Sequence, residues 1–230
     1  MVKPNQLIVA LDVEDRAAAE KIIKKISPPV TFYKVGMRLF TKEGPDFIRW
    51  LKRRKLKVFL DLKFYDIPNT VAQAVESATS LGVDLLTLHA SGGSEMMKAA
   101  VKAAQVASKR TRKKAPLIFA VTVLTSMDRL DFLGIQKTIP DQVLHLAKLA
   151  ADSKVDGVVC SPQELRMLKK KFQKRLLLLT PGIRFDSQNN DDQKRIATPT
   201  QALKDGADYL VIGRPVLQAE KPLEVIRSIL

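Results

Sequence analysis

The feature that most constrains the fold of this chain is a regular alternation of short apolar segments with longer amphipathic ones. Eight segments of the first kind are expected to be strands, namely residues 7–13, 31–36, 57–63, 85–90, 117–124, 157–161, 176–182 and 209–214. Helical patterns lie between them, including residues 15–26, 70–81, 94–108 and 141–152, and a last helix is expected from Pro215 to Ile229. The chain therefore reads as eight repeats of strand and helix.

Near-continuous apolar strands separated by helices predict a parallel sheet that is covered on both faces. The length of 230 residues suits a closed barrel of eight such repeats, which typically needs about 250. A doubly wound open sheet is the alternative, but it usually stops at five or six strands, and no Gly-x-Gly-x-x-Gly follows any strand. We predict an α/β fold, a (β/α)8 TIM barrel, with residues 1–230 as a single domain.

Two longer polar segments interrupt this alternation. One runs from about Ser126 to Pro140, and the other is RFDSQNNDDQKRIATP after the seventh strand. Long polar loops on the carboxyl side of a barrel are usually functional, so we expect lids.

The chain is strongly basic, with 39 Lys and Arg against 24 Asp and Glu and a formal net charge of +15. That charge favours an anionic partner, such as nucleic acid, a membrane surface or a phosphorylated metabolite. The cations cluster where predicted helices end, however, where they suit the helix dipole, and only 6% of the residues are aromatic. We expect no specific nucleic-acid binding, although weak nonspecific binding stays open.

The expected location follows from what the sequence lacks. A single cysteine, Cys160, offers no internal disulfide, and we find no signal peptide and no apolar stretch of membrane-spanning length. We expect a cytoplasmic protein with no membrane association.

Polar residues at the carboxyl ends of barrel strands are the informative exceptions to the apolar pattern, because active sites form there. They are Asp12, Lys34, Asp61, Lys63, His89, Thr125, Arg184 and Arg214. His89 has no partner at metal-ligand spacing, and we expect it to be structural.

Asp61 and Lys63 are two residues apart, so on a regular strand both project to one face while Leu62 faces the helices. A structural ion pair at the barrel rim would explain these two residues alone. It would not explain why Asp12 and Lys34 occupy the same layer. Opposite charges from three adjacent strands favour an assembled site.

The end of the chain supplies a candidate phosphate site, because barrels of this kind bind phosphate with the loops after strands seven and eight. Those loops read TPGIR and IGRP. Gly213 allows close backbone approach, and Arg214, with Arg184, offers guanidinium donors. The alternative is a rim glycine with solvated arginines.

The sequence resembles the orotidine 5′-phosphate decarboxylase family over essentially its whole length. The most specific motif is DLKFYDIPNT at residues 61–70, supported by LIVALDV, YKVG, VTVLTS, TPGIR, DDQKR and VIGRP. The shorter pattern Asp-x-Lys-x-x-Asp is shared by related barrels that process sugar phosphates, and a metal-dependent decarboxylase or aldolase of that kind is the main alternative.

The resemblance implies loss of CO2 from orotidine monophosphate to give uridine monophosphate, with no metal and no organic cofactor. It implies that Lys63 donates the proton, that Asp61 lies beside the departing carboxylate, and that Lys34 and Asp66 complete the charge array. Asp66 would come from the neighbouring subunit of a homodimer with shared sites. The substrate-binding residues that it implies are Asp12, Lys34, Asp61, Ile67, Thr70, Thr125, Arg184, Gln193, Gly213 and Arg214.

Overall fold

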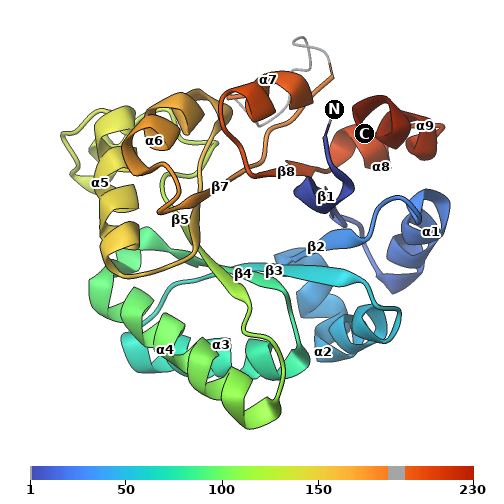
Figure 1. The fold of residues 1–230 in the computed structure, drawn as a ribbon, viewed down its shortest axis with the longest axis horizontal. Helices are drawn as coiled ribbons and strands as arrows, with labels where there is room; N and C mark the ends of the chain where they lie inside the picture. Colours follow the sequence, from blue (N-terminus) through green and yellow to red (C-terminus); the bar gives the residue numbers. More distant parts are fainter. Residues whose placement is uncertain (1, 186–194) are drawn as a thin grey trace.

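Eight short parallel strands form a closed barrel in the computed structural model, which describes residues 2–185 and 195–230 (Figure 1). The strands pair in chain order, and β8 closes the barrel against β1 with Leu210 opposite Leu7. This confirms the predicted (β/α)8 barrel. The strands are β1 (Leu7–Ala10), β2 (Phe32–Gly36), β3 (Lys57–Phe64), β4 (Leu85–His89), β5 (Leu117–Val121), β6 (Gly157–Val159), β7 (Leu177–Thr180) and β8 (Tyr209–Ile212).

The helices surround the barrel as an outer layer (Figure 1). They are α1 (Arg16–Ile26), α2 (Met37–Arg53), α3 (Pro68–Leu81), α4 (Gly93–Thr111), α5 (Ile139–Asp152), α6 (Leu165–Phe172), α7 (Pro199–Lys204), α8 (Arg214–Leu217) and α9 (Pro222–Ile229). Side chains cap several amino-terminal ends: Asp15 accepts from the backbone of Ala18, and Thr138 and Thr198 cap α5 and α7 in the same way.

Two apolar cores follow from the alternation of side chains along each strand. The smaller one fills the barrel and consists of Ile8, Ala10, Phe32, Phe59, Leu85, Phe119, Leu179 and Val211. The larger one lies between the strands and the helices, and Leu7 and Val9 of β1 belong to it. Because the barrel interior is packed with side chains, only the two ends of the barrel are open to ligands.

The predicted helix from Pro215 to Ile229 is wrong as a single element. The structure has the short helix α8 and then α9, which starts at Pro222. Proline has no amide hydrogen to donate and suits the first turn of a new helix, which is why the chain restarts there. The amphipathic pattern alone did not mark this break.

The first predicted lid, the loop after β5, is largely irregular. It contains one 3-10 turn, η3 (Asp131–Leu133), before α5 begins at Ile139. Most of the second predicted lid, residues 186–194, lies outside the described residues. Its flanks meet, since Ile183 pairs with Ala197 in an isolated parallel bridge.

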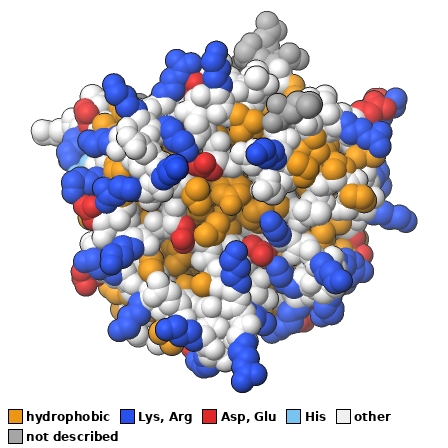
Figure 2. Space-filling model, viewed as in Figure 1, with side chains coloured by type: hydrophobic (Ala, Val, Ile, Leu, Met, Phe, Trp, Pro, Cys, Tyr) orange, Lys and Arg blue, Asp and Glu red, His pale blue; other side chains and the backbone are white. Residues whose placement is uncertain are grey.

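Part of each basic cluster lies in the last turn of α2, α4 or α6, as the sequence predicts, whereas Lys57 starts β3 and Lys114 lies in the loop before β5. Figure 2 shows Lys and Arg side chains spread over the visible face, around apolar side chains near its centre. On this face the positive charge is distributed rather than gathered into one stripe.

Candidate active site

Four charged side chains meet at the carboxyl ends of β1, β2 and β3. The ammonium Nζ of Lys34 lies 2.9 Å from Oδ1 of Asp12 and 3.3 Å from Oδ2 of Asp61. Nζ of Lys63 lies 2.9 Å from the other oxygen of Asp61. The array therefore alternates in sign, in the order Asp12, Lys34, Asp61, Lys63, and the structure brings together all four residues that the sequence placed in one layer.

Asp61 is the buried centre of this array, with 8% of its surface exposed. Burial raises the pKa of its carboxyl group, but the charges of Lys34 and then Lys63, with hydrogen bonds from Lys63 and Thr87, outweigh burial and bring the pKa below its ordinary value. Asp61 is consequently a fixed negative charge at neutral pH.

Lys34 shows the opposite balance. Burial lowers the pKa of its ammonium group, but the charges of Asp61 and Asp12 outweigh burial and bring the pKa above its ordinary value. The charges of Lys34 and Asp61 thus stabilise each other, and removing either would leave the other buried without its compensating charge.

Lys63 reaches Asp61 in a way that regular strand geometry does not give. Its backbone has a φ of 50°, in the left-handed region that a side chain other than glycine seldom adopts. The pairing of β3 with β4 shifts at the same place: Leu60 is opposite Leu86, whereas Phe64 is opposite Leu88. Regular strand alternation predicted that Asp61 and Lys63 would be neighbours, which is correct. Their contact depends, however, on a β-bulge that orients the Lys63 side chain.

Thr87 of β4 holds this bulge and was not predicted as a site residue. Its fully buried hydroxyl donates to Oδ1 of Asp61 at 2.8 Å and accepts from the backbone N–H of Lys63 at 3.1 Å. One hydroxyl thus satisfies both residues of the pair. A polar residue within the otherwise apolar run LLTLHA was the available signal.

Gly36 of β2 is a second residue that the sequence reading missed. A Cβ atom there would lie 3.0 Å from Nζ of Lys34 and 3.2 Å from Oδ1 of Asp12, closer than such contacts normally come. The glycine therefore leaves room for the ion pair of Lys34 and Asp12.

The predicted phosphate residues are only partly described. Gly213, at the end of β8, lies beside the array, since a Cβ atom there would be 3.7 Å from Oδ2 of Asp12. Arg214 begins α8, and Arg184 is buried, with Nη1 donating to the carbonyl of Ile183 at 2.9 Å. Gln193 lies outside the described residues.

Thr125 is partly buried and follows β5 in the loop where a pyrimidine-edge contact was predicted.

The segment between β3 and α3 is exposed and carries the predicted residues Asp66 and Ile67, and the predicted Thr70 is exposed in the first turn of α3. Asp66 accepts the backbone N–H of Ile67 at 2.6 Å, and no ion pair joins it to the array within the described part of this chain. Two large apolar side chains flank Asp66: Tyr65 is 61% exposed and Ile67 is 66% exposed. Such an apolar edge is typical of a surface that a partner covers.

His89 lies next to the array and packs its ring against Tyr65, with centroids 5.4 Å apart. Burial and then the charge of Lys63 lower the pKa of His89, so its ring is neutral at neutral pH. Cys160 is fully buried, and burial raises the pKa of its thiol well above the ordinary value. A buried thiol with a raised pKa is typical of a structural cysteine rather than a nucleophile.

A buried ion pair fixes the chain at Arg195, the first described residue after the gap at 186–194. The guanidinium of Arg195 contacts the carboxylate of Glu164 and also donates to the carbonyl of Leu124 at 3.0 Å. Glu164 in turn accepts the backbone N–H of Ser161 at 2.6 Å. The loops after β5, β6 and β7 are tied together through these contacts.

Two features bear on other kinds of site. Across residues 2–185 and 195–230, no three or more His, Cys, Asp or Glu side chains lie grouped so that they could hold a metal ion. No helix in those ranges has both the length and the apolar character needed to cross a bilayer.

The fold and the site define a class: a (β/α)8-barrel protein with a buried aspartate between two lysines at its mouth. Residues 5–229 match the model of the orotidine 5′-phosphate decarboxylase / HUMPS family, and the chain belongs to that family.

Two relatives with about half of their residues identical to this chain are both named orotidine 5′-phosphate decarboxylase. The orotidine 5′-phosphate decarboxylase of Actinobacillus pleuropneumoniae is 50% identical over 227 residues, which cover 98% of this chain and 97% of that protein. The enzyme of the same name from Legionella pneumophila is 47% identical over 98% of this chain and 97% of its own length. A crystal structure of orotidine 5′-phosphate decarboxylase from Lactobacillus acidophilus has a TM-score of 0.86 and 38% identity, and covers 97% of this chain and 96% of its own.

Proposed function

We propose that this protein is an orotidine 5′-phosphate decarboxylase, which converts orotidine 5′-monophosphate into uridine 5′-monophosphate in pyrimidine biosynthesis. The observation that carries the proposal is the Lys63–Asp61–Lys34 array at the mouth of a barrel of this family. Near-full-length relatives at about 50% identity bear this name, which favours it over a sugar-phosphate enzyme of the same family.

The chemistry places a strict demand on the site. When the bond between the pyrimidine ring and its carboxylate breaks, CO2 leaves and the electron pair stays on the ring carbon. A fixed positive charge beside that carbon lowers the barrier because it stabilises the developing carbanion. In the proposed mechanism Lys63 supplies the charge and then transfers a proton from Nζ to the carbon, so that no metal or organic cofactor takes part.

Asp61 has two candidate roles, repulsion of the substrate carboxylate or orientation of Lys63. The contacts favour orientation, because Asp61 binds Lys63 at 2.9 Å while Thr87 holds the same carboxylate oxygen. In the proposal Asp12 and Lys34 also bind the ribose hydroxyls.

The rest of the nucleotide has its own proposed contacts. Thr125 lies at the pyrimidine edge, and four residues from the β7 and β8 loops bind the phosphate: Arg184, Gln193, Gly213 and Arg214. Phosphate binding is remote from the reacting carbon, so its free energy can organise the site for the chemical step.

We also propose a homodimer in which Asp66, Ile67 and Thr70 of each chain complete the site of the other. The exposure of Tyr65 and Ile67 beside Asp66 supports this arrangement, because association would cover both side chains. A cytoplasmic location is part of the proposal, and the unpaired Cys160 agrees with a reducing compartment.

The test is to follow the orotate absorbance when purified protein meets orotidine monophosphate in the presence of a chelator. We expect complete conversion to uridine monophosphate. No loss of absorbance would refute the decarboxylase, and activity that the chelator abolishes would favour a metal-dependent enzyme.

A further inference from the structure

A cavity of about 420 Å³ lies at the end of the barrel opposite the charge array. Its walls include residues at the amino-terminal starts of four strands, with Phe32 from β2, Lys57 from β3, Leu117 from β5 and Tyr209 from β8. The array lies at the carboxyl ends of these parallel strands. The cavity is therefore a separate place on the molecule, and the proposed decarboxylation does not use it.

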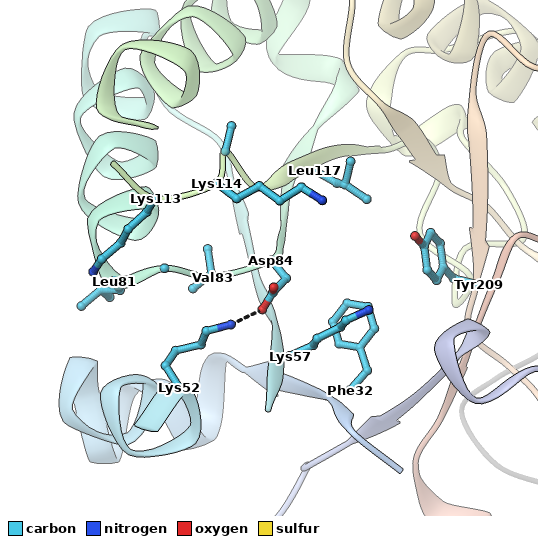
Figure 3. Close-up of a pocket in the computed structure, with 12 residues that line it drawn as sticks. Phe32, Lys52, Lys57, Leu81, Val83, Asp84, Lys113, Lys114, Leu117 and Tyr209 are labelled. Atoms are coloured by element: carbon cyan, nitrogen blue, oxygen red, sulfur yellow. Dashed lines mark hydrogen bonds and ion pairs between the residues drawn. The ribbon is translucent and has the colours of Figure 1, made fainter. Parts of the chain in front are cut away.

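The charge of the cavity is strongly positive. Four lysines line it, and Asp84 is the single acidic residue among the lining residues (Figure 3). Asp84 is already engaged, because it accepts from Nζ of Lys52 at 2.6 Å and from the backbone N–H of Val58 at 2.8 Å. Lys113 donates to the carbonyl of Ser80. Those contacts account for two of the four lysines.

Lys57 and Lys114 are different. No acidic side chain in the described part of the chain forms an ion pair with either, and Nζ of Lys57 lies 5.9 Å from the centroid of the Phe32 ring. In Figure 3 Lys114 extends from one side of the pocket toward Leu117, and Tyr209 lies on the other side with its hydroxyl turned toward the pocket. Burial, with the charges of Asp208 and Asp156, raises the pKa of Tyr209, so its hydroxyl is a neutral donor.

Helix ends do not explain these two cations. Lys52 lies in the last turn of α2, where a positive charge suits the helix dipole. Lys57, by contrast, starts a strand, and Lys114 follows the end of α4 at Thr111 in the loop that leads to β5. Lys57 and Lys114 are both exposed at the mouth of the cavity, where an anion from solvent can reach them.

We propose that this cavity binds a small phosphorylated anion, whose phosphate oxygens accept from Lys57, Lys114 and Tyr209. The volume falls within the range of about 300–1,000 Å³ that is typical of small-molecule sites. Two ammonium groups and a hydroxyl supply several donors for the oxygens of one phosphate or diphosphate group.

Inorganic pyrophosphate is the probe, titrated calorimetrically against the full chain. Every protein carries Arg214→Ala, which weakens the proposed phosphate site at the other end of the barrel, and any binding that remains there is the same in all the proteins compared. The test variant adds Lys57→Met and Lys114→Met, which remove two charges but keep the aliphatic stems. The control adds Lys170→Met and Lys171→Met on α6, an equal change of charge away from the cavity.

We expect saturable binding in the parent and in the control, and a loss of at least about tenfold in affinity in the test variant. Thermal unfolding without pyrophosphate verifies that the variants fold, since surface substitutions usually change stability little. Equal weakening in the test and control variants would show nonspecific charge attraction and overturn the proposal. Absence of saturable binding in the parent at millimolar pyrophosphate would also overturn it.

Discussion

Thr87 donates a hydrogen bond from its buried hydroxyl to Oδ1 of Asp61 at 2.8 Å. The same oxygen accepts from Nζ of Lys63 at 2.9 Å, and the hydroxyl accepts the backbone N–H of Lys63. A neutral residue on β4 therefore sets the position of the ion pair on β3. This relationship gives the first prediction.

Thr87→Val keeps the shape of the side chain but removes its hydroxyl. We expect kcat for orotidine monophosphate to fall roughly 10- to 100-fold with little change in KM, because the reacting lysine is misplaced while the nucleotide contacts stay. The free energy of unfolding, measured in urea, should fall by about 1–3 kcal/mol, because the backbone N–H of Lys63 and the carboxylate of Asp61 lose their buried partner. Thr87→Ser is the control and should restore both properties; a fully active valine variant would contradict the positioning role.

Lys63→Ala removes the proposed proton donor. We expect uridine monophosphate binding to stay within about tenfold of the parent, whereas decarboxylation should fall by at least about 10³-fold. Calorimetry and the absorbance assay measure the two effects separately. Lys98→Ala, on the exposed surface of α4, is the matched control, and substantial turnover by Lys63→Ala would rule out the assigned donor.

The proposal that Asp66 completes the site of a second subunit predicts complementation between two inactive variants. Lys63→Ala and Asp66→Ala chains, denatured together and refolded, form hybrids in which one site has both intact residues. Random association of equal amounts should recover about a quarter of parental activity, since half of the dimers are hybrids with one intact site each. Mixtures that stay as inactive as their components would show that Asp66 acts within its own chain or that no shared dimer forms.

The pH dependence of stability follows from Asp61. Its pKa in the folded protein lies below the ordinary 3.8, so its charge contributes stability above that value, and the contribution is lost as pH falls through the folded-state pKa. The stability difference between the parent and Asp61→Asn should therefore be constant from neutral pH to about pH 5 and shrink in stronger acid. Urea unfolding at a series of pH values measures it.

The contribution of Lys34 to stability depends on pH in the opposite direction. Its pKa in the folded protein lies above the ordinary 10.5, so its contribution is complete below that value and is lost as pH rises through the folded-state pKa. The corresponding variant, Lys34→Met, should approach parental stability only in strong alkali. A stability difference that does not change with pH for either variant would contradict the assigned charge states.

The buried pair of Arg195 and Glu164 predicts a large loss of stability from a single substitution. Arg195→Met should lower the free energy of unfolding by about 3–5 kcal/mol, because Glu164 would stay buried without its cation. Adding Glu164→Gln should recover part of this loss. Arg129→Met, which disrupts an exposed pair with Asp131, is the control and should cost no more than about 0.5 kcal/mol.

The sequence alone determined the barrel, because eight apolar strands alternating with helices have few other ways to cover both faces of a parallel sheet. It also identified Asp12, Lys34, Asp61 and Lys63, since charged residues stand out at the ends of apolar strands. The barrel and the four charged residues can both be predicted from the sequence because each depends on a local pattern of apolar and charged residues.

Tertiary structure alone decided how those residues are held. The left-handed backbone of Lys63 and the hydrogen bonds of Thr87 arise from pairing between β3 and β4, which no periodicity in either strand encodes. The Arg195–Glu164 pair likewise joins loops that are distant in sequence. The cavity lined by Lys57 and Lys114 also depends on tertiary structure, because it forms only where the starts of separate strands converge.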